Sequence, residues 1–133
     1  MVNILLVSHY NLAHCIKETA FLIVGERKNV HSISIEKDEG IEIFTEKIKK
    51  KVEELKGEIL IMTDMFGGTP SNVSLMLFGN NSNVQIIAGF NLPLVIESIM
   101  HSDMNVKDLK DMLIQKKNKT IINAKEIFKG KGK

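Results

Sequence analysis

The hydrophobic and polar positions of the chain follow two alternating patterns. Short apolar runs, in part broken by serine or threonine, predict buried strands at residues 2–7, 30–35, 58–63 and 84–88. Apolar positions at three-and-four spacing predict amphipathic helices at residues 12–24, 41–55, 70–78, 92–100 and 106–116. The first helix is expected to bury an apolar stripe, and a last short strand is expected at residues 120–123. The stripe consists of Leu12, Cys15, Ile16, Thr19, Ala20 and Ile23.

Strands that alternate with helices of this length predict an α/β fold with a doubly wound, mainly parallel sheet and helices on both faces. Binding sites of such sheets lie beyond the carboxyl ends of the strands. That rule selects the segments that follow the first, third and fourth strands, at residues 8–11, 63–70 and 89–93.

Composition favours one globular domain, because 44% of the 133 residues are hydrophobic, 26% are charged and only two are proline. We expect this domain to span residues 1–123 and residues 124–133 to be a basic, frayed tail. A single cysteine predicts a reducing compartment, the cytoplasm, and neither a membrane helix nor a signal peptide is apparent. Nine of the 18 basic residues lie after residue 106 and the chain has no tryptophan, which argues against nucleic-acid binding.

His9 and Asp64 are the strongest candidates for chemistry. Each directly follows a predicted strand, so each is expected at the carboxyl edge of the sheet. A neutral imidazole can act there as a nucleophile, a base or a metal ligand. If the first and third strands are neighbours, Asp64 can hold one ring nitrogen of His9 and leave the other free as a nucleophile. Without such a contact, Asp64 would only cap its loop.

The loop after Asp64 has the character of an anion site. Gly67 and Gly68 are followed by Thr69, which is predicted to cap the next helix, and by Pro70 and Ser71. Unsatisfied amides at such a helix N-terminus can bind phosphate. The glycine spacing matches neither a Walker loop nor a dinucleotide-binding fingerprint, so neither ATP nor NAD is expected.

The other histidines are weaker candidates. His14 lies about 140° around the helix from His9, and we expect it on a solvated flank. His31 and His101 fall away from the predicted carboxyl edge, where structural or surface roles are expected. No group of cysteine and histidine residues has metal-ligand spacing, so neither a metal nor a cofactor is predicted.

Three ordered motifs together resemble the IIA component of the mannose-family sugar phosphotransferase system. They are Ser8-His9, the sequence TDMFGGTPSN at residues 63–72 and the sequence GFNLPL at residues 89–94. The resemblance covers about residues 2–117. It implies a phosphotransferase that carries its phosphoryl group on His9, with Asp64 as the orienting carboxylate. It also implies a phosphate-binding loop formed by Gly67, Gly68, Thr69 and Ser71.

The same resemblance implies a set of partners. The phosphoryl group would come from the histidine-containing phosphocarrier protein and pass to the IIB subunit, with the IIC and IID membrane subunits reached only indirectly. The sugar is bound by those membrane subunits, so this chain is not expected to carry the specificity for it. A homodimer is implied in which the strand at residues 120–123 is exchanged, and the open alternative is that this strand folds back onto its own sheet. One departure is Tyr10, which stands where the family usually has glycine.

Two alternatives are open. The phosphoryl-donor subunit of dihydroxyacetone kinases resembles this fold and also has a histidine after the first strand, although its pattern after the third strand is closer to Asp-Leu-Gly-Ser-Ala. A receiver-like signalling domain would instead be phosphorylated on Asp64. That class needs an acidic pair after the first strand to hold magnesium, and Ser8-His9 stands there.

Overall fold

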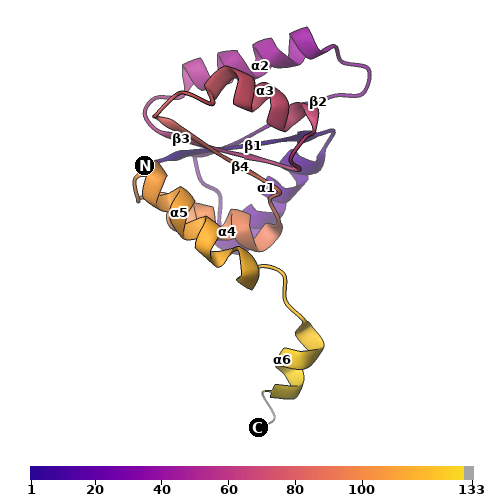
Figure 1. Ribbon diagram of the computed structural model, residues 1–133, viewed down its shortest axis with the longest axis vertical. Helices are drawn as coiled ribbons and strands as arrows, with labels where there is room; N and C mark the ends of the chain where they lie inside the picture. Colours follow the sequence, from indigo (N-terminus) through magenta and orange to yellow (C-terminus); the bar gives the residue numbers. More distant parts are fainter. Residues whose placement is uncertain (131–133) are drawn as a thin grey trace.

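The computed structural model describes residues 1–130, which form a four-stranded sheet covered by helices (Figure 1). The strands are β1 (Asn3–His9), β2 (Val30–Ile35), β3 (Ile59–Thr63) and β4 (Val84–Ala88). The helices are α1 (Leu12–Val24), α2 (Ile41–Glu54), α3 (Thr69–Phe78), α4 (Leu92–Met100), α5 (Val106–Lys116) and α6 (Ala124–Gly130), with a short 3₁₀ turn η1 (Lys117–Lys119).

The sheet is parallel throughout and has the strand order β2-β1-β3-β4. The central strand β1 pairs Val7 with Thr63 on one side and His9 with Ile35 on the other. The α/β fold with parallel strands is therefore confirmed. The register also determines the site, because the residues that follow Val7 and Thr63 leave the sheet side by side.

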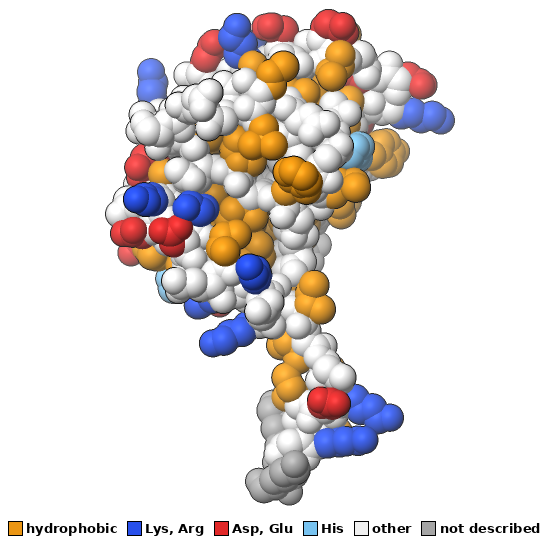
Figure 2. Space-filling model, viewed as in Figure 1, with side chains coloured by type: hydrophobic (Ala, Val, Ile, Leu, Met, Phe, Trp, Pro, Cys, Tyr) orange, Lys and Arg blue, Asp and Glu red, His pale blue; other side chains and the backbone are white. Residues whose placement is uncertain are grey.

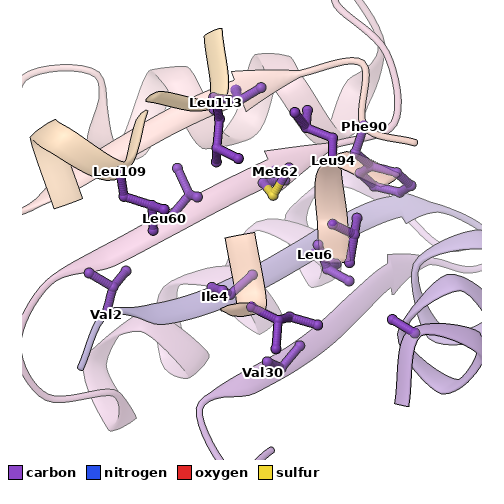
Figure 3. Packing of buried hydrophobic residues seen from close by; sticks show 14 of the residues in the cluster. Val2, Ile4, Leu6, Val30, Leu60, Met62, Phe90, Leu94, Leu109 and Leu113 are labelled. Carbon is purple, nitrogen blue, oxygen red and sulfur yellow. The ribbon is translucent and has the colours of Figure 1, made fainter. Parts of the chain in front are cut away.

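Two hydrophobic clusters hold helices on opposite faces of the sheet (Figure 1). Alternate side chains of β1 divide between them, because successive residues of a strand point to opposite faces. Ile4 and Leu6 pack beneath α1, α4 and α5, where Leu109 and Leu113 cover the centre of the sheet (Figure 3). Leu5 and Val7 pack with residues of α2 and α3 on the other face.

The buried face of α1 matches the stripe expected from the sequence only in part, since Ala20 is buried and Ile16 packs against the core as expected. Ala13 and Ala20 are its fully buried residues, whereas Leu12 and Ile23 are 50% and 59% exposed and Cys15 is an exposed free thiol. The small alanines let α1 lie close to the sheet, so the larger apolar side chains on its flank stay outside. Apolar spacing alone could not distinguish these two neighbouring stripes.

The end of the chain also departs from the sequence-based prediction. Residues 120–123 were expected to form a strand, but within this single chain they form a turn and an irregular stretch that leads into α6. No described strand lies beside them to supply backbone partners, and Ile121 is 81% exposed. Figures 1 and 2 show this segment leaving the body of the molecule, with hydrophobic and lysine side chains on its surface.

Candidate functional site

His9 and Asp64 meet at the carboxyl edge of the sheet. His9 is the last residue of β1, and Asp64 directly follows β3. The backbone amide of Asp64 donates to the carbonyl of Val7 at 3.2 Å, so the carboxylate emerges directly beside the end of β1. The first and third strands are neighbours, so the condition set by the sequence is met and the two candidate side chains come together.

One carboxylate oxygen of Asp64 accepts two hydrogen bonds from His9. Its Oδ2 lies 2.7 Å from the ring nitrogen Nδ1 and 2.9 Å from the backbone nitrogen of His9. An ionised carboxylate can only accept, so Nδ1 carries the proton and the second ring nitrogen, Nε2, has a free lone pair. The His9 side chain is 48% exposed, which leaves this nitrogen open to an incoming group.

The environment of Asp64 suits a ring that becomes cationic when it is substituted. The side chain is only 8% exposed, and its second oxygen, Oδ1, is buried without a hydrogen-bond partner among the described residues. A desolvated carboxylate with an unpaired oxygen gains stability from a cation beside it. The pair is therefore suited to stabilise His9 when substitution of Nε2 makes the ring cationic.

The loop between β3 and α3 touches the imidazole directly. A side-chain carbon added to Gly68 would lie 2.8 Å from Cε1 and 3.4 Å from Nε2 of His9, which is too close. Gly67 precedes it with a φ of +88°, a conformation that favours glycine. The amides of Gly67, Gly68 and Thr69 donate no hydrogen bond within residues 1–130. Gly68 thus brings the start of α3, with its unpaired amides, next to the imidazole, an arrangement typical of anion sites.

We expect Gly68→Ala to displace the His9 ring and to slow phosphorylation of the protein by about ten- to a hundredfold, the scale of a small misplacement of a reacting group. The added methyl carbon would lie 2.8 Å from Cε1 of His9, which is too close for two carbon atoms, so the ring has to move. The initial rate of phosphorylation, measured by mass spectrometry, tests this.

Gly40→Ala is the matched control for Gly68→Ala. Gly40 is the N-cap of α2 and has an extended backbone like that of Gly68, the N-cap of α3. Its added carbon would make only an ordinary contact, 3.4 Å from Glu42. Both variants lose similar capping energy, so equal phosphorylation rates for the two would contradict a specific role for Gly68.

Two expectations for the phosphate loop need correction. Thr69 does not cap α3, since the helix begins at Thr69 and Gly68 occupies the N-cap without a side-chain hydrogen bond. The hydroxyl of Ser71 is not presented to solvent, because the residue is fully buried. This hydroxyl donates to the carbonyl of Met65 at 2.6 Å and lies 2.5 Å from Oγ1 of Thr63. Ser71 thus anchors the loop from inside through its side chain.

Ser8 is a positioning residue that the sequence interpretation did not single out. It is fully buried, and its hydroxyl accepts from the amide of Ala13 at 2.7 Å while it donates to the carbonyl of His9 at 3.0 Å. Ser8 therefore supplies a cap for α1 from within β1 and fixes the turn that carries His9. The small polar residue at the end of an apolar strand was the available signal.

Tyr10 occupies a strained position in this turn. Its φ is +48°, in the left-handed region, where a residue with a side chain costs about 1–2 kcal/mol. Its amide is held by the carbonyl of Ile35 at 2.9 Å. Glycine adopts this conformation without strain, so tyrosine at this position carries a cost that glycine would avoid.

The third motif does not reach the imidazole. The amides of Gly89 and Phe90 donate to the carbonyl of Thr63 at 2.8 and 3.1 Å, and Phe90 is buried. Asn91 caps α4 by accepting from Leu94, and its amide donates to Thr120 at 2.9 Å. This segment supports the end of β3 and ties the final segment of the chain to the body.

The remaining histidines lie outside this site. His14 is exposed on α1, and His31 is half-buried in β2 with Nε2 3.4 Å from Oδ1 of Asn3. Burial, with Lys51 and Lys17 nearby, lowers the pKa of His31 below its ordinary value. His101 pairs with Glu97 at 3.3 Å on the surface. Across residues 1–130, no three acidic, cysteine or histidine side chains are grouped so that they could hold a metal ion.

Comparison with known proteins agrees with this site. Residues 3–114 match the family model described as the PTS system fructose IIA component. The sorbose-specific EIIA component of Lacticaseibacillus casei is 34% identical over 94% of this chain and 98% of its own length. The crystal structure of the PTS IIA protein associated with the fucose utilization operon from Streptococcus pneumoniae has a TM-score of 0.85, 32% identity and 96% and 99% coverage. That of EIIA from Streptococcus agalactiae has a TM-score of 0.87, 28% identity and 95% and 99% coverage.

The parallel sheet, the histidine at its carboxyl edge and these matches define a phosphotransferase-type α/β domain. The chain belongs to the mannose-family IIA components of the sugar phosphotransferase system. The matches favour this family over a dihydroxyacetone kinase subunit and over a receiver domain. A receiver would also need an accessible Asp64, whereas this side chain is buried against His9. Among the described helices, none combines the length and the hydrophobicity needed to span a membrane.

Proposed function

We propose that this protein is a phosphoryl carrier that uses Nε2 of His9. It accepts the phosphoryl group from the histidine-containing phosphocarrier protein and passes it to the IIB subunit, and it serves the IIC and IID membrane subunits only through IIB. The observation that carries this proposal is the 2.7 Å contact between Nδ1 of His9 and the buried Asp64 carboxylate, which leaves Nε2 free. The cytoplasm is the proposed compartment for this exchange.

In the proposed reaction, the lone pair of Nε2 attacks the phosphorus of the donor phosphohistidine in line with the bond that breaks. A new P–N bond forms to His9 as the donor P–N bond is lost, and the donor leaves as a neutral imidazole. The proton on Nδ1 stays in its hydrogen bond to Asp64, so the phosphorylated His9 ring is cationic beside a carboxylate. Transfer to IIB is the same step in reverse, with the IIB side chain as nucleophile.

The amides of Gly67, Gly68 and Thr69 are the proposed ligands of the phosphoryl oxygens. They lie at the N-terminus of α3, whose dipole favours negative charge. Gly68 packs against the ring at Cε1, next to Nε2, so these amides are close to where the phosphorus would be held. Catalysis of phosphoryl transfer depends mainly on such positioning and on neutralising the oxygen charges.

Incubation with phosphoenolpyruvate, enzyme I and the phosphocarrier tests this function. We expect the mass of the protein to rise by one phosphoryl group, and we expect added IIB to remove that group. Absence of labelling, with the phosphocarrier itself fully phosphorylated, would contradict the proposal. If the phosphocarrier labels the protein but IIB from the same system cannot remove the label, the assignment of IIB as the acceptor would be contradicted.

The protein is further proposed to form a homodimer through the segment at residues 120–123. The edge of β4 is unpaired in the described sheet, and Ile121 and Ile122 are exposed in the single chain. Exposed edges and exposed β-branched residues favour pairing with a second chain. If the segment at residues 120–123 of each subunit formed a strand on the sheet of the other subunit, it would cover both the β4 edge and the two isoleucines.

Truncation after Asn118 is expected to convert a stable dimer into a monomer or a much weaker dimer, because it removes residues 120–123. Analytical ultracentrifugation at tens of micromolar measures this. Truncation after Asn123 is the control, since it deletes α6 and the lysine-rich end but keeps the proposed strand. A full-length protein that sediments as a monomer would contradict the dimer, without affecting the role of His9.

A further inference from the structure

Tyr10 has a backbone conformation that tyrosine seldom adopts, with φ at +48°. The bond from its amide to Ile35 fixes the backbone, yet the side chain is 60% exposed and makes no hydrogen bond within residues 1–130. Strained positions that persist beside a reactive group point to a functional reason for the residue.

The Tyr10 side chain borders an open hollow of about 440 Å³ next to His9. The other lining residues are Ile35, Glu36 and Lys37. Most of the lining is apolar, and the two charged residues have opposite signs. The hollow therefore suits an uncharged, apolar side chain better than a charged ligand.

Exposed apolar side chains also lie on the other loop that meets His9. Met65 and Phe66 are 54% and 78% exposed, and they precede Gly68, which touches the ring. Methionine and aromatic residues are enriched in protein interfaces. A partner must bring phosphorus into contact with Nε2 for transfer, so its surface must cover the residues around this nitrogen.

We infer that Tyr10 is a specificity-determining residue for the phosphohistidine-bearing protein partner. Its ring and Ile35 receive an apolar side chain that lies next to the partner's own reactive histidine. The left-handed backbone directs the Tyr10 ring toward the hollow. The contact at the adjacent Nε2 then fixes how the partner lies on this surface. This inference rests on the proposed function, because the donor and the acceptor must both reach the same nitrogen and both use this hollow.

Transfer kinetics with Tyr10→Asn, Tyr10→Gly and Tyr10→Phe test the inference. Asparagine and glycine both tolerate a positive φ, so these variants remove the ring without new strain. We expect each to raise both the KM for the phosphocarrier and the KM for IIB by about tenfold, the scale of a lost interface anchor, with kcat within about twofold of the unmodified protein. Tyr10→Phe keeps the ring and is expected to keep both KM values within about twofold.

Leu22→Ala is the control for loss of an exposed apolar side chain, since Leu22 is 90% exposed near the far end of α1. Thermal melting should show no loss of stability for Tyr10→Asn or Tyr10→Gly. An unchanged KM for either partner in Tyr10→Asn would overturn the inference, as would an equal rise in Leu22→Ala. If the unmodified protein is phosphorylated on His9 while these KM values are unchanged, only the role of Tyr10 fails. If His9 is never phosphorylated, the proposed function fails.

Discussion

His9→Ala is expected to abolish phosphorylation of the protein by the phosphocarrier. The ring nitrogen Nε2 is the proposed nucleophile, Gly68 lies against the ring beside it, and alanine offers no replacement. Because the His9 side chain is 48% exposed at the edge of the sheet, its removal should leave the fold intact. Intact-protein mass spectrometry after incubation with phosphoenolpyruvate, enzyme I and the phosphocarrier measures the loss.

His101→Ala is the matched control for this variant. His101 is also exposed, at 42%, and also has a carboxylate partner, with Nε2 3.3 Å from Glu97. The glycine loop at residues 67–68 lies against His9 and not against His101. His101→Ala should therefore be phosphorylated at the rate of the unmodified protein. Labelling that persists in His9→Ala and disappears in His101→Ala would mean that the wrong histidine has been assigned.

Asp64→Asn is expected to keep the fold and to slow phosphoryl transfer at least about tenfold. The asparagine can still accept a hydrogen bond from Nδ1, but it supplies no negative charge to the phosphorylated ring. A charge-assisted hydrogen bond contributes about 1–3 kcal/mol, and 1.4 kcal/mol corresponds to a factor of ten. Rapid-quench measurement of transfer from the phosphocarrier and of transfer to IIB gives both rates.

Glu97→Gln is the control for Asp64→Asn, because it removes the carboxylate partner of the other paired histidine. Its transfer rates should equal those of the unmodified protein. Wild-type rates for Asp64→Asn in both directions would show that the 2.7 Å contact has no part in transfer. A base-labile label that is absent in Asp64→Asn would instead support phosphorylation of the carboxylate.

The sequence was sufficient to predict an α/β fold with a parallel sheet and to select the segments after its strands as candidates for a site. Short apolar runs separated by helical periods specify parallel strands, and a parallel sheet gathers the residues after its strands at one edge. The contact between His9 and Asp64 follows once β1 and β3 are neighbours, as their register shows. The hydrophobic pattern does not determine strand order, so this contact was conditional until the structure showed that β1 pairs with β3.

Other features depend on packing that the pattern does not encode. Ser71 was expected at the phosphate from the family resemblance, but its hydroxyl is buried against Thr63. Spacing placed Ala20 on the buried side of α1, but it did not reveal that Ala13 is buried there while Leu12 and Ile23 stay exposed. The close approach of Gly68 to the imidazole is likewise a three-dimensional property.

The backbone of Tyr10 gives a similar lesson. The sequence identified an unusual residue after His9, and only the structure shows that its φ is positive and that its ring borders a hollow. At the C-terminal segment, by contrast, the sequence predicted an element that the single chain does not form. A β-prone sequence at residues 120–123 forms no strand in one chain, because a strand requires a neighbour to pair with.

The central claim is that Nε2 of His9 carries the phosphoryl group while Asp64 holds Nδ1. NMR of the phosphorylated protein, with nitrogen-15 in the histidine rings, tests it most directly through the coupling of phosphorus to a ring nitrogen. The account predicts one phosphohistidine, at position 9, with phosphorus bonded to Nε2, a proton on Nδ1, and a linkage that acid cleaves and base does not. Phosphorus bonded to Nδ1, or a base-labile acyl phosphate on Asp64, would contradict it.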